Sequence, residues 1–321
     1  MRLLVTGAAG FVGSAVAGEA VRSGHDVVGI VRPKASAQTF GDVPSPFLSV
    51  AADFRDGAAM AEIIRRTRPD VVVHIGWSGV DGASRNGIAQ INDNIAAACA
   101  LVEACAEAGV RKFVGIGSQA EYGLLSGKVS EDQLPMPTSL YGATKLSVQL
   151  LTRQLAAQSG LSFAWLRLFA AYGPGDRPHW LIPSLIETML DGRRPKTTVG
   201  TQRWDYLYID DVARGILAVA ETEAAEGVFN LGSGVPVPVR TVVEHIRDLA
   251  APGMDLVFGE IPYGPAQIWH LEADVTRLKI AAGWAPQVEI QAGLARTVAW
   301  HRERRRQSQT NGLTSGDGVR V

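Results

Sequence analysis

The sequence predicts an α/β fold in which a doubly wound parallel sheet is covered by helices on both faces, with a smaller lobe in the C-terminal half. Three observations carry this prediction. Short apolar runs alternate with helix-like segments over the first 120 residues, the pattern of parallel strands joined by helical crossovers. Glycines separate the first apolar run from the first helix. Beyond Phe169, proline and glycine become frequent, as in a lobe of loops and short elements.

The expected strands and helices alternate along the chain, and helix-breaking residues mark several boundaries. We expect strands at Leu3–Val5, Asp26–Val31, Asp70–Ile75, Lys112–Ile116, Ser162–Leu168 and Gly227–Leu231, and helices at Gly13–Ser23, Met60–Arg68, Asn94–Ala108, Leu140–Ser159 and Asp210–Ala220. Each strand is a short run dominated by apolar residues. Pro69, Gly109 and Gly160 end three of the helices.

The strand at 227–231 is expected to return to the first sheet, which interleaves the two domains in sequence. We expect a dinucleotide-binding domain in residues 1–169 plus about 207–233, and a substrate-binding lobe in about 170–206 plus 234–306. Residues 307–321 are rich in Ser, Thr, Gly and Gln and are predicted to be disordered.

The composition excludes several classes of partner. Lys and Arg total 31 against 32 Asp and Glu, so nothing favours nucleic acid or an anionic membrane surface. No stretch reaches the ~18 apolar residues of a membrane span, and the apolar start breaks at Gly7, too early for a secretory signal. Cys99 and Cys105 lack a metal-ligand spacing and are expected to be free thiols. We therefore expect a cytoplasmic protein without a metal site.

Glycines at positions 7, 10 and 13 follow the first strand and open the first helix. Gly7 permits a tight turn, Gly10 lets the backbone approach phosphates, and Gly13 allows the helix to pack closely on the strand. The helix is expected to start near Gly13, and the free N–H groups and partial positive charge at its N-terminus suit a pyrophosphate. This turn predicts dinucleotide binding.

The residues at the end of the second strand indicate whether a site prefers NADP or NAD. No carboxylate stands there to accept a hydrogen bond from a ribose 2′-hydroxyl. Arg32 can pair with a 2′-phosphate, so NADP(H) is favoured and NAD is possible, with a solvated surface role for Arg32 as the alternative. Asp53 and Phe54 follow the presumed third strand, where Asp53 would accept from an adenine amino group or serve as a turn residue.

Tyr141 and Lys145 are four residues apart and lie on one face of a helix. A neighbouring ammonium stabilises a phenolate and lowers the tyrosine pKa from its usual value of about 10. Tyr141 would then give a proton to a carbonyl oxygen, or take one from an alcohol, while Lys145 holds the nicotinamide ribose. Ser118, just past a strand, would polarise the same oxygen. The set predicts hydride transfer between a dinucleotide and an alcohol or ketone.

These motifs and others resemble, in their order, the extended short-chain dehydrogenase/reductase family of nucleotide-sugar epimerases, dehydratases and reductases. The resemblance covers about residues 1 to 303 and rests on Gly7–Gly13, Asp53, His74–Gly76, Asn94, Ser118–Gly123, Tyr141–Lys145, Leu166–Phe169, Tyr172–Gly175, Asp205–Val212, Asn230–Gly232 and Gly283–Pro286. It implies a Rossmann-type fold with a smaller C-terminal substrate-binding lobe, and catalysis by Ser118, Tyr141 and Lys145. It also implies a homodimer built through the helices at 94–108 and 140–159.

The resemblance, together with the residue patterns, implies two binding sets. The cofactor-binding set is Gly7, Gly10, Phe11, Val12, Gly13, Arg32, Asp53, Phe54, Ile75, Gly76, Asn94, Tyr141, Lys145 and Leu168. The substrate-binding set is Ser118, Gln119, Tyr141, Ala170, His179, Trp180, Arg203 and Trp204. Trp180, Trp204 and Trp269 either stack on a base or sugar or belong to the core.

The chain departs from the family pattern at several positions. Members that dehydrate a sugar carry an Asp–Glu pair after the serine, and here those positions are Gln119 and Ala120, which argues against dehydration. Glu121 comes one residue later and would point the other way on an extended segment. Ala170 and Trp204 stand where the family usually has Asn and Arg contacts to the sugar diphosphate.

The favoured function is an NADP(H)-dependent reductase of the C4 keto group of a nucleotide-activated 6-deoxy sugar, with the proton supplied by Tyr141. It rests on Arg32, the serine–tyrosine–lysine set and the missing dehydration pair. The alternative is a nucleotide-sugar 4-epimerase with tightly bound NAD that uses the same three residues. Reduction of a non-sugar carbonyl and dinucleotide sensing without turnover are further alternatives.

Overall fold

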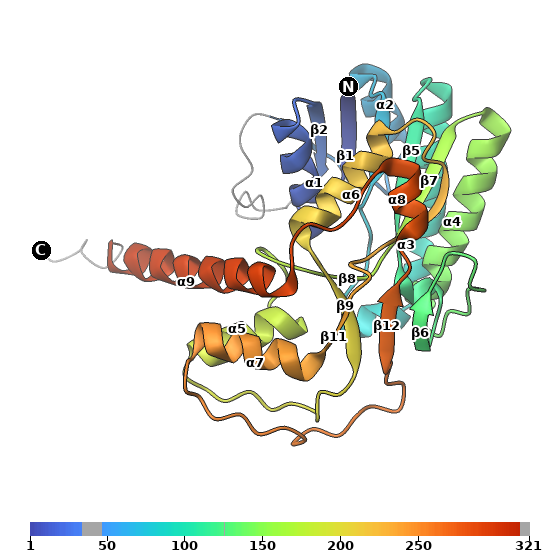
Figure 1. Cartoon of the computed structure of the whole chain (residues 1–321). Coiled ribbons are helices and arrows are strands. Elements are labelled where there is room, and N and C mark those ends of the chain that lie inside the picture. The colour runs from blue at the N-terminus through green and yellow to red at the C-terminus, as the bar shows by residue number, and fades with distance from the viewer. Residues whose placement is uncertain (34–46, 125, 315–321) are drawn as a thin grey trace, which may run out of the picture.

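The structure is a computed structural model that describes residues 1–33, 47–124 and 126–314. In these residues the larger sheet has seven parallel strands in the order β10-β7-β5-β4-β1-β2-β3 (Figure 1). Its strands are β1 (Arg2–Thr6), β2 (Asp26–Val31), β3 (Leu48–Ala51), β4 (Val71–His74), β5 (Lys112–Ser118), β7 (Ser162–Leu168) and β10 (Gly227–Leu231). The strand order reverses between β1 and β4, and doubly wound sheets bind their ligands at such a switch point.

Helices cover both faces of this sheet. One face carries α1 (Phe11–Arg22) and α6 (Ile209–Glu221), and the other carries α2 (Gly57–Thr67), α3 (Ala89–Glu107) and α4 (Leu140–Ser159) (Figure 1). Side chains of β1 alternate between the two cores. Leu3 and Val5 join the core under α1 and α6, while Leu4 joins the core under α2 and α3. Burial on both faces explains why these strands are continuously apolar.

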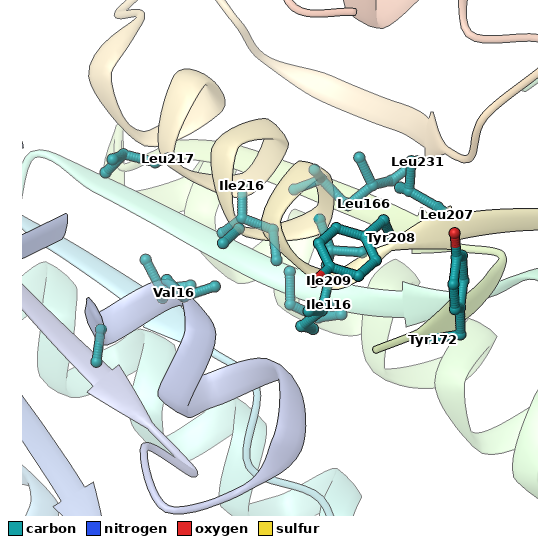
Figure 2. Close-up of a cluster of buried hydrophobic side chains, with 14 of the residues drawn as sticks. Val16, Ile116, Leu166, Tyr172, Leu207, Tyr208, Ile209, Ile216, Leu217 and Leu231 are labelled. Atoms are coloured by element: carbon teal, nitrogen blue, oxygen red, sulfur yellow. The ribbon is translucent and has the colours of Figure 1, made fainter. Parts of the chain in front are cut away.

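The core under α6 fixes the carboxyl ends of the central strands. Figure 2 shows Ile209 and Ile216 of α6 beside Ile116 and Leu166 of the sheet, with Val16 of α1 in the same cluster. All five side chains are buried. The strand ends that carry functional residues therefore rest on close-packed side chains.

A second, smaller sheet lies beyond the carboxyl edge of the first. Its described strands are β6 (Ser126–Val129), β9 (Arg203–Tyr208), β11 (Pro236–Pro238) and β12 (His270–Ala273), in the order β11-β9-β12-β6, and β8 (Ala170–Tyr172) pairs with β9. Its helices α5 (Leu181–Leu190), α7 (Val239–Ala250) and α9 (Ile290–Thr314) pack against one another, while α8 (Thr276–Ala282) packs against α6 and β10. Figure 1 shows α9 running past α5 and α7 toward the C-terminus.

The structure confirms the predicted doubly wound parallel sheet. The strands at 26–31, 162–168 and 227–231 and the helix at 140–159 have the predicted bounds. β10 pairs with β7, as expected for a chain that returns to the first sheet. The residue bounds of the two domains stay predictions.

The predicted disorder from residue 307 onward is wrong for residues 307–314, which continue α9. Side chains one turn apart support this part of the helix: Gln307 Nε2 donates to Glu303 at 3.2 Å, and Ser308 Oγ donates to the Arg304 carbonyl at 3.0 Å. Residues 315–321 lie outside the described part of the chain. In the described part, no helix combines the length and the apolar character needed to cross a membrane.

Candidate active site

The glycine-rich turn joins β1 to α1 at the switch point of the sheet. Gly7 has a φ of 71°, which L side chains rarely adopt. A Cβ on Gly13 would lie 2.0 Å from the Gly7 carbonyl oxygen, so α1 packs on this turn only with glycine there. Gly10 is the N-cap of α1 without a side-chain cap, which leaves N–H groups of the first turn free for an anion. The turn fits a dinucleotide pyrophosphate.

Replacement of Gly13 by Ala should destabilise this turn and weaken dinucleotide binding. The backbone shift that relieves such overpacking costs about 1–3 kcal/mol. We expect a lower thermal midpoint and an affinity about tenfold weaker or worse by fluorescence titration. Gly264→Ala is the matched control, because a Cβ on Gly264 meets nothing within 4 Å. Equal affinities in the two variants would contradict the role of Gly13.

The segment after β4 forms the opposite wall of the switch point. The Thr6 hydroxyl accepts hydrogen bonds from the Ile75 and Gly76 amides, at 3.1 and 3.0 Å. Asn94 of α3 is buried, and its side chain accepts from the Ser78 amide at 2.8 Å and donates to the Ser78 carbonyl at 3.2 Å. Asn94 therefore fixes this wall, while contact with a cofactor stays a prediction for Ile75, Gly76 and Asn94.

Asp53, the predicted acceptor for an adenine amino group, is paired with Arg55 of the protein itself. Arg55 Nη2 donates to Asp53 Oδ2 at 2.6 Å, and this hydrogen bond lowers the Asp53 pKa. Arg32 follows β2, is exposed, and adds its positive charge to the same effect. The Phe54 ring lies in the core, 5.5 Å from the His74 ring. An adenine amino group would have to share the Asp53 carboxylate with Arg55.

His74 and the two cysteines have structural surroundings. Burial lowers the pKa of His74 to about 3, so its ring is neutral, and Nδ1 lies 2.9 Å from Thr6 Oγ1. Cys99 and Cys105 are free, and burial raises the pKa of both thiols. In the described ranges, no three or more His, Cys, Asp or Glu side chains are grouped so as to hold a metal ion.

The structure brings Ser118 and Tyr141 together at the carboxyl edge of the large sheet. Ser118 ends β5, and Tyr141 lies in the first turn of α4. The Ser139 hydroxyl caps this helix by accepting from the Gly142 amide at 3.1 Å. Burial, the largest effect, raises the Tyr141 pKa, and a hydrogen bond with the Ser118 side chain lowers it. The pair is placed to act on one oxygen, and its catalytic role stays a prediction.

Lys145 is one turn further along α4, but its ammonium is engaged away from the phenol. Nζ donates to the Ile116 carbonyl at 2.6 Å and lies 3.6 Å from the Trp77 ring centroid, compared with 6.0 Å for the Tyr141 ring. The sequence assigns the lowering of the Tyr141 pKa to Lys145, whereas the cation that lowers it in the structure is Arg85. Burial lowers the pKa of Lys145 itself to about 7.

The buried Lys145 amine should make stability depend on pH. Its pKa is 10.5 as a free side chain and about 7 in the folded protein, so the unfolded chain binds more protons between these values. The free energy of unfolding should therefore rise from pH 7 toward pH 10, with the full penalty below pH 7. Urea unfolding at both pH values should show a smaller rise for Lys145→Met, while the exposed Lys128→Met keeps it. If the free energy of unfolding of Lys145→Met rose between pH 7 and pH 10 as much as that of the wild type, a buried Lys145 charge would be contradicted.

Glu121 belongs to a buried hydrogen-bond network. Residues Gln119–Glu121 form a 3-10 turn, η3, where the sequence predicts an extended segment. The Glu121 carboxylate accepts from the Ser118 amide at 2.9 Å, from Trp165 Nε1 at 3.0 Å and from Arg167 Nε at 2.7 Å. Its side chain is 0% exposed. The carboxylate is therefore a structural acceptor.

Two predicted substrate residues lie next to Ser118 and the end of β7. Gln119 begins η3, and its Oε1 is buried without a hydrogen-bond partner in the described residues. Ala170 begins β8 just after Leu168, the half-buried last residue of β7. Gln119 thus offers a free acceptor at this edge, while Leu168 and Ala170 offer apolar surface and backbone groups.

His179 and Trp180 lie in the loop that enters α5. His179 Nε2 is 3.4 Å from Asp81, and Arg177 also pairs with Asp81. Asp81 precedes the 3-10 turn η2 (Gly82–Asn86), so these contacts join the α5 loop to the segment after β4. Trp180 is partly exposed and packs beside His179, at 5.4 Å between ring centroids.

The remaining predicted substrate residues lie on the second sheet. Arg203 Nη2 donates to the Pro236 carbonyl at 2.8 Å, and Trp204 Nε1 donates to the Ile268 carbonyl at 3.3 Å. Trp204 is half-buried against the core of this lobe, whereas Trp269 is 51% exposed. The structure supports a core role for Trp204 and leaves the Trp269 ring open to a ligand.

Sequence reasoning missed two side chains that contact the Tyr141 ring. The Trp77 ring lies edge-on to the Tyr141 ring at 6.1 Å, and its Nε1 donates to Gln90 Oε1 at 2.9 Å. The Arg85 guanidinium carbon lies 4.1 Å from the Tyr141 ring centroid. Their position in the sequence could have identified them, because Trp77 and Arg85 both follow β4, which ends at the switch point.

Comparison with known proteins identifies the family. Residues 3–232 match the model of the NAD dependent epimerase/dehydratase family. The chain belongs to this family. The match includes the glycine-rich turn, η3 and the start of α4, which are the elements that build the candidate site.

Relatives within the epimerase/dehydratase family cover nearly the whole chain. A dTDP-glucose 4,6-dehydratase of Streptomyces griseus is 32% identical over 94% of this chain and 94% of its own length. A UDP-glucuronate 4-epimerase of Thermodesulfobacterium geofontis is 29% identical over 94% of this chain and 96% of its own. The structure of UDP-glucuronic acid 4-epimerase from Bacillus cereus, in complex with UDP-glucuronic acid and NAD, superposes with a TM-score of 0.83 at 29% identity, covering 95% of this chain and 100% of that one.

Proposed function

We propose that this chain is a nucleotide-sugar 4-epimerase that retains NAD(H) through its catalytic cycle. The observation that carries the proposal is the Ser118–Tyr141 pair, which lies at the same sheet edge as the glycine-rich turn. Such a pair can move one proton to and from a sugar hydroxyl. The neighbouring acid, Glu121, is committed to the fold, so the site is equipped for proton transfer at one oxygen.

The relatives support epimerisation over reduction. The proteins from Thermodesulfobacterium geofontis and Bacillus cereus are named 4-epimerases, and the Bacillus cereus structure contains NAD and a UDP-sugar. The sequence favoured the reductase, but the same three residues serve both reactions. Ser118, Tyr141 and Lys145 do not distinguish the two functions. The preference for an epimerase therefore rests on the relatives.

Dehydration is disfavoured, although the Streptomyces griseus relative is named a 4,6-dehydratase. Loss of water from a 4-keto sugar needs an acid and a base beyond the tyrosine. Gln119 and Ala120 can supply neither. Glu121, the nearest carboxylate in the chain, accepts three hydrogen bonds inside the protein.

The residues present fit a dinucleotide. The turn at Gly7, Gly10 and Gly13 would hold the pyrophosphate, and Lys145 would hold the nicotinamide ribose on exchanging the Ile116 carbonyl for ribose hydroxyls. When bound, the nicotinamide ring supplies a reversible hydride acceptor. We propose NAD as the retained form, and the preference for NADP based on Arg32 stays a prediction.

Tyr141 carries the proton through the reaction. Its phenolate takes the proton of the C4 hydroxyl while C4 loses hydride, and the phenol returns that proton once the other face of the sugar has received the hydride. The Ser118 hydroxyl donates a hydrogen bond to the same C4 oxygen and steadies it in both directions. The proton count is unchanged over the cycle, as an isomerisation requires.

The proposal is tested by cofactor content and product. The purified protein is denatured, the released dinucleotide is identified, and the native protein is incubated with UDP-glucose, UDP-glucuronic acid and dTDP-glucose. Released NAD and a C4 epimer detected by NMR, without added dinucleotide, are expected. Oxidation of added NADPH by a 4-keto sugar nucleotide, with no epimer formed, would instead establish the reductase. A 4-keto-6-deoxy product would establish the dehydratase.

We also propose that the protein forms a homodimer through α3 and α4. The two helices pack side by side, and Leu150 and Leu151 of α4 are each 45% exposed. Two copies that bury these faces would form the four-helix interface that the sequence predicts. Light scattering gives the mass in solution, and a monomer at micromolar concentration would contradict it.

A further inference from the structure

Arg85 covers the ring of Tyr141. It lies in η2, is half-buried, and its guanidinium carbon is 4.1 Å from the centroid of the tyrosine ring. A guanidinium at this distance from an aromatic face is attracted to the ring, by ~0.5–1 kcal/mol at exposed sites and ~2 kcal/mol when desolvated. The contact therefore restrains both partners.

Two contacts hold η2 and Trp77 beside the start of α4. The Asn86 side chain accepts a hydrogen bond from the Leu140 amide at 3.1 Å, directly before Tyr141 in the chain. The Trp77 indole donates to Gln90 Oε1 at 2.9 Å and meets the Tyr141 ring edge-on. The position of the phenol thus depends on the segment after β4 as well as on its own helix.

Three charged groups and one hydroxyl surround the Tyr141 phenol. Burial, the largest effect, opposes its ionised form and raises the Tyr141 pKa. Arg85 of η2 and the Ser118 hydroxyl of β5 favour the ionised form, while the Glu121 carboxylate of η3 also opposes it. Lys145 of α4 has a pKa of about 7, so its amine loses its charge just above neutral pH. An arginine guanidinium stays protonated at every pH the protein tolerates.

We propose that Arg85 is a positioning residue for Tyr141. Its guanidinium holds the phenol ring in place and keeps a permanent positive charge beside it. The ring contact and the anchoring of η2 carry the inference. It rests on the proposed function only for its effect on turnover, because the phenol and the guanidinium meet whatever the substrate is.

The direct test is a titration of the phenol. The chain has 6 tyrosines, and carbon-13 at Cζ reports the ionisation of each by NMR, with Tyr141→Phe identifying the Tyr141 signal. In Arg85→Gln, the Tyr141 midpoint should rise by about one pH unit, a tenfold loss of acidity. Arg85→Lys, which keeps the charge, should recover most of this shift. Arg85→Met is a second neutral variant if Arg85→Gln does not fold.

Arg296→Gln is the matched control. Arg296 lies over the ring of Tyr208, at 5.7 Å from its centroid, so this variant should move the Tyr208 signal and leave that of Tyr141 in place. Equal Tyr141 midpoints in wild type and both neutral variants would overturn the proposal. So would a wild-type Tyr141 that stays protonated up to the pH of alkaline unfolding.

Turnover gives the second readout and separates this inference from the proposed function. If the protein is an epimerase, the pH of half-maximal turnover on the acid side should rise in Arg85→Gln by the same amount as the phenol midpoint. If no nucleotide sugar is epimerised, the proposed function fails, and the NMR titration still decides the role of Arg85.

Discussion

Replacement of Tyr141 by Phe should lower epimerase turnover about 10²- to 10⁴-fold, the usual contribution of a positioned acid or base. The change removes only the phenol oxygen, whose interaction with the Ser118 side chain lowers the Tyr141 pKa. Without it, the proposed proton acceptor is gone, and Glu121 cannot replace it because its carboxylate is enclosed by its own donors. The bound NAD content and the thermal midpoint should stay near wild-type values, since the dinucleotide turn is a separate element. Initial rates measure the turnover, and the NAD released on denaturation measures the bound cofactor.

Tyr122→Phe is the matched control for the loss of one phenol oxygen. The Tyr122 hydroxyl donates to Asn230 Oδ1 at 2.7 Å in a buried site, so its loss should lower the free energy of unfolding by about 1 kcal/mol and spare turnover. A Tyr141→Phe protein with more than a tenth of wild-type turnover would assign the proton transfer to another group.

The large sheet and the dinucleotide turn were predictable because their determinants are local. The runs that form β2 and β7 are apolar on both faces, and glycines at positions 7 and 13 satisfy contacts within a few residues of each other. The same holds for Tyr141 and Lys145, whose spacing on one helix is visible in the sequence. Local patterns therefore predicted the fold class, and they also nominated the candidate catalytic side chains.

The contacts that set the chemistry of the site are long-range and were not predictable. Glu121 meets Arg167, 46 residues away, and the Lys145 amine meets a carbonyl 29 residues away. Arg85, in the β4–β5 crossover, contacts Tyr141 in the β5–β7 crossover. No periodicity encodes such pairs. The sequence therefore assigned the cation beside the phenol to Lys145, the nearest one along the helix.

The sequence motifs do not distinguish a reductase from an epimerase. Both reactions use the same tyrosine and serine, and they differ in whether the dinucleotide leaves between turnovers. On the proposed function, that difference is a free energy of binding that the predicted cofactor contacts would share, at the turn of Gly7–Gly13, at Asp53 and along the wall after β4. Arg32 is one exposed residue, and a single predicted contact does not distinguish a reductase from an epimerase.

Replacement of Arg167 by Met should lower the free energy of unfolding by about 3–5 kcal/mol, the effect of breaking a buried ion pair from one side. The side chains of Arg167 and Glu121 are 4% and 0% exposed, and Nε donates to the carboxylate at 2.7 Å. Met fills similar space but leaves Glu121 charged with two neutral donors, from Trp165 and the Ser118 amide. Urea unfolding measures the loss.

The double variant Glu121→Gln/Arg167→Met separates loss of charge balance from loss of packing. Removing both charges should recover much of the stability, since well-packed neutral groups often replace a buried pair without penalty. Arg65→Met, which breaks the exposed pair with Glu62, should cost less than about 1 kcal/mol. An Arg167→Met effect as small as this would mean that the carboxylate is solvated or protonated in solution. Glu121 would then become a candidate acid beside Ser118, and the argument against dehydration from its burial would fall.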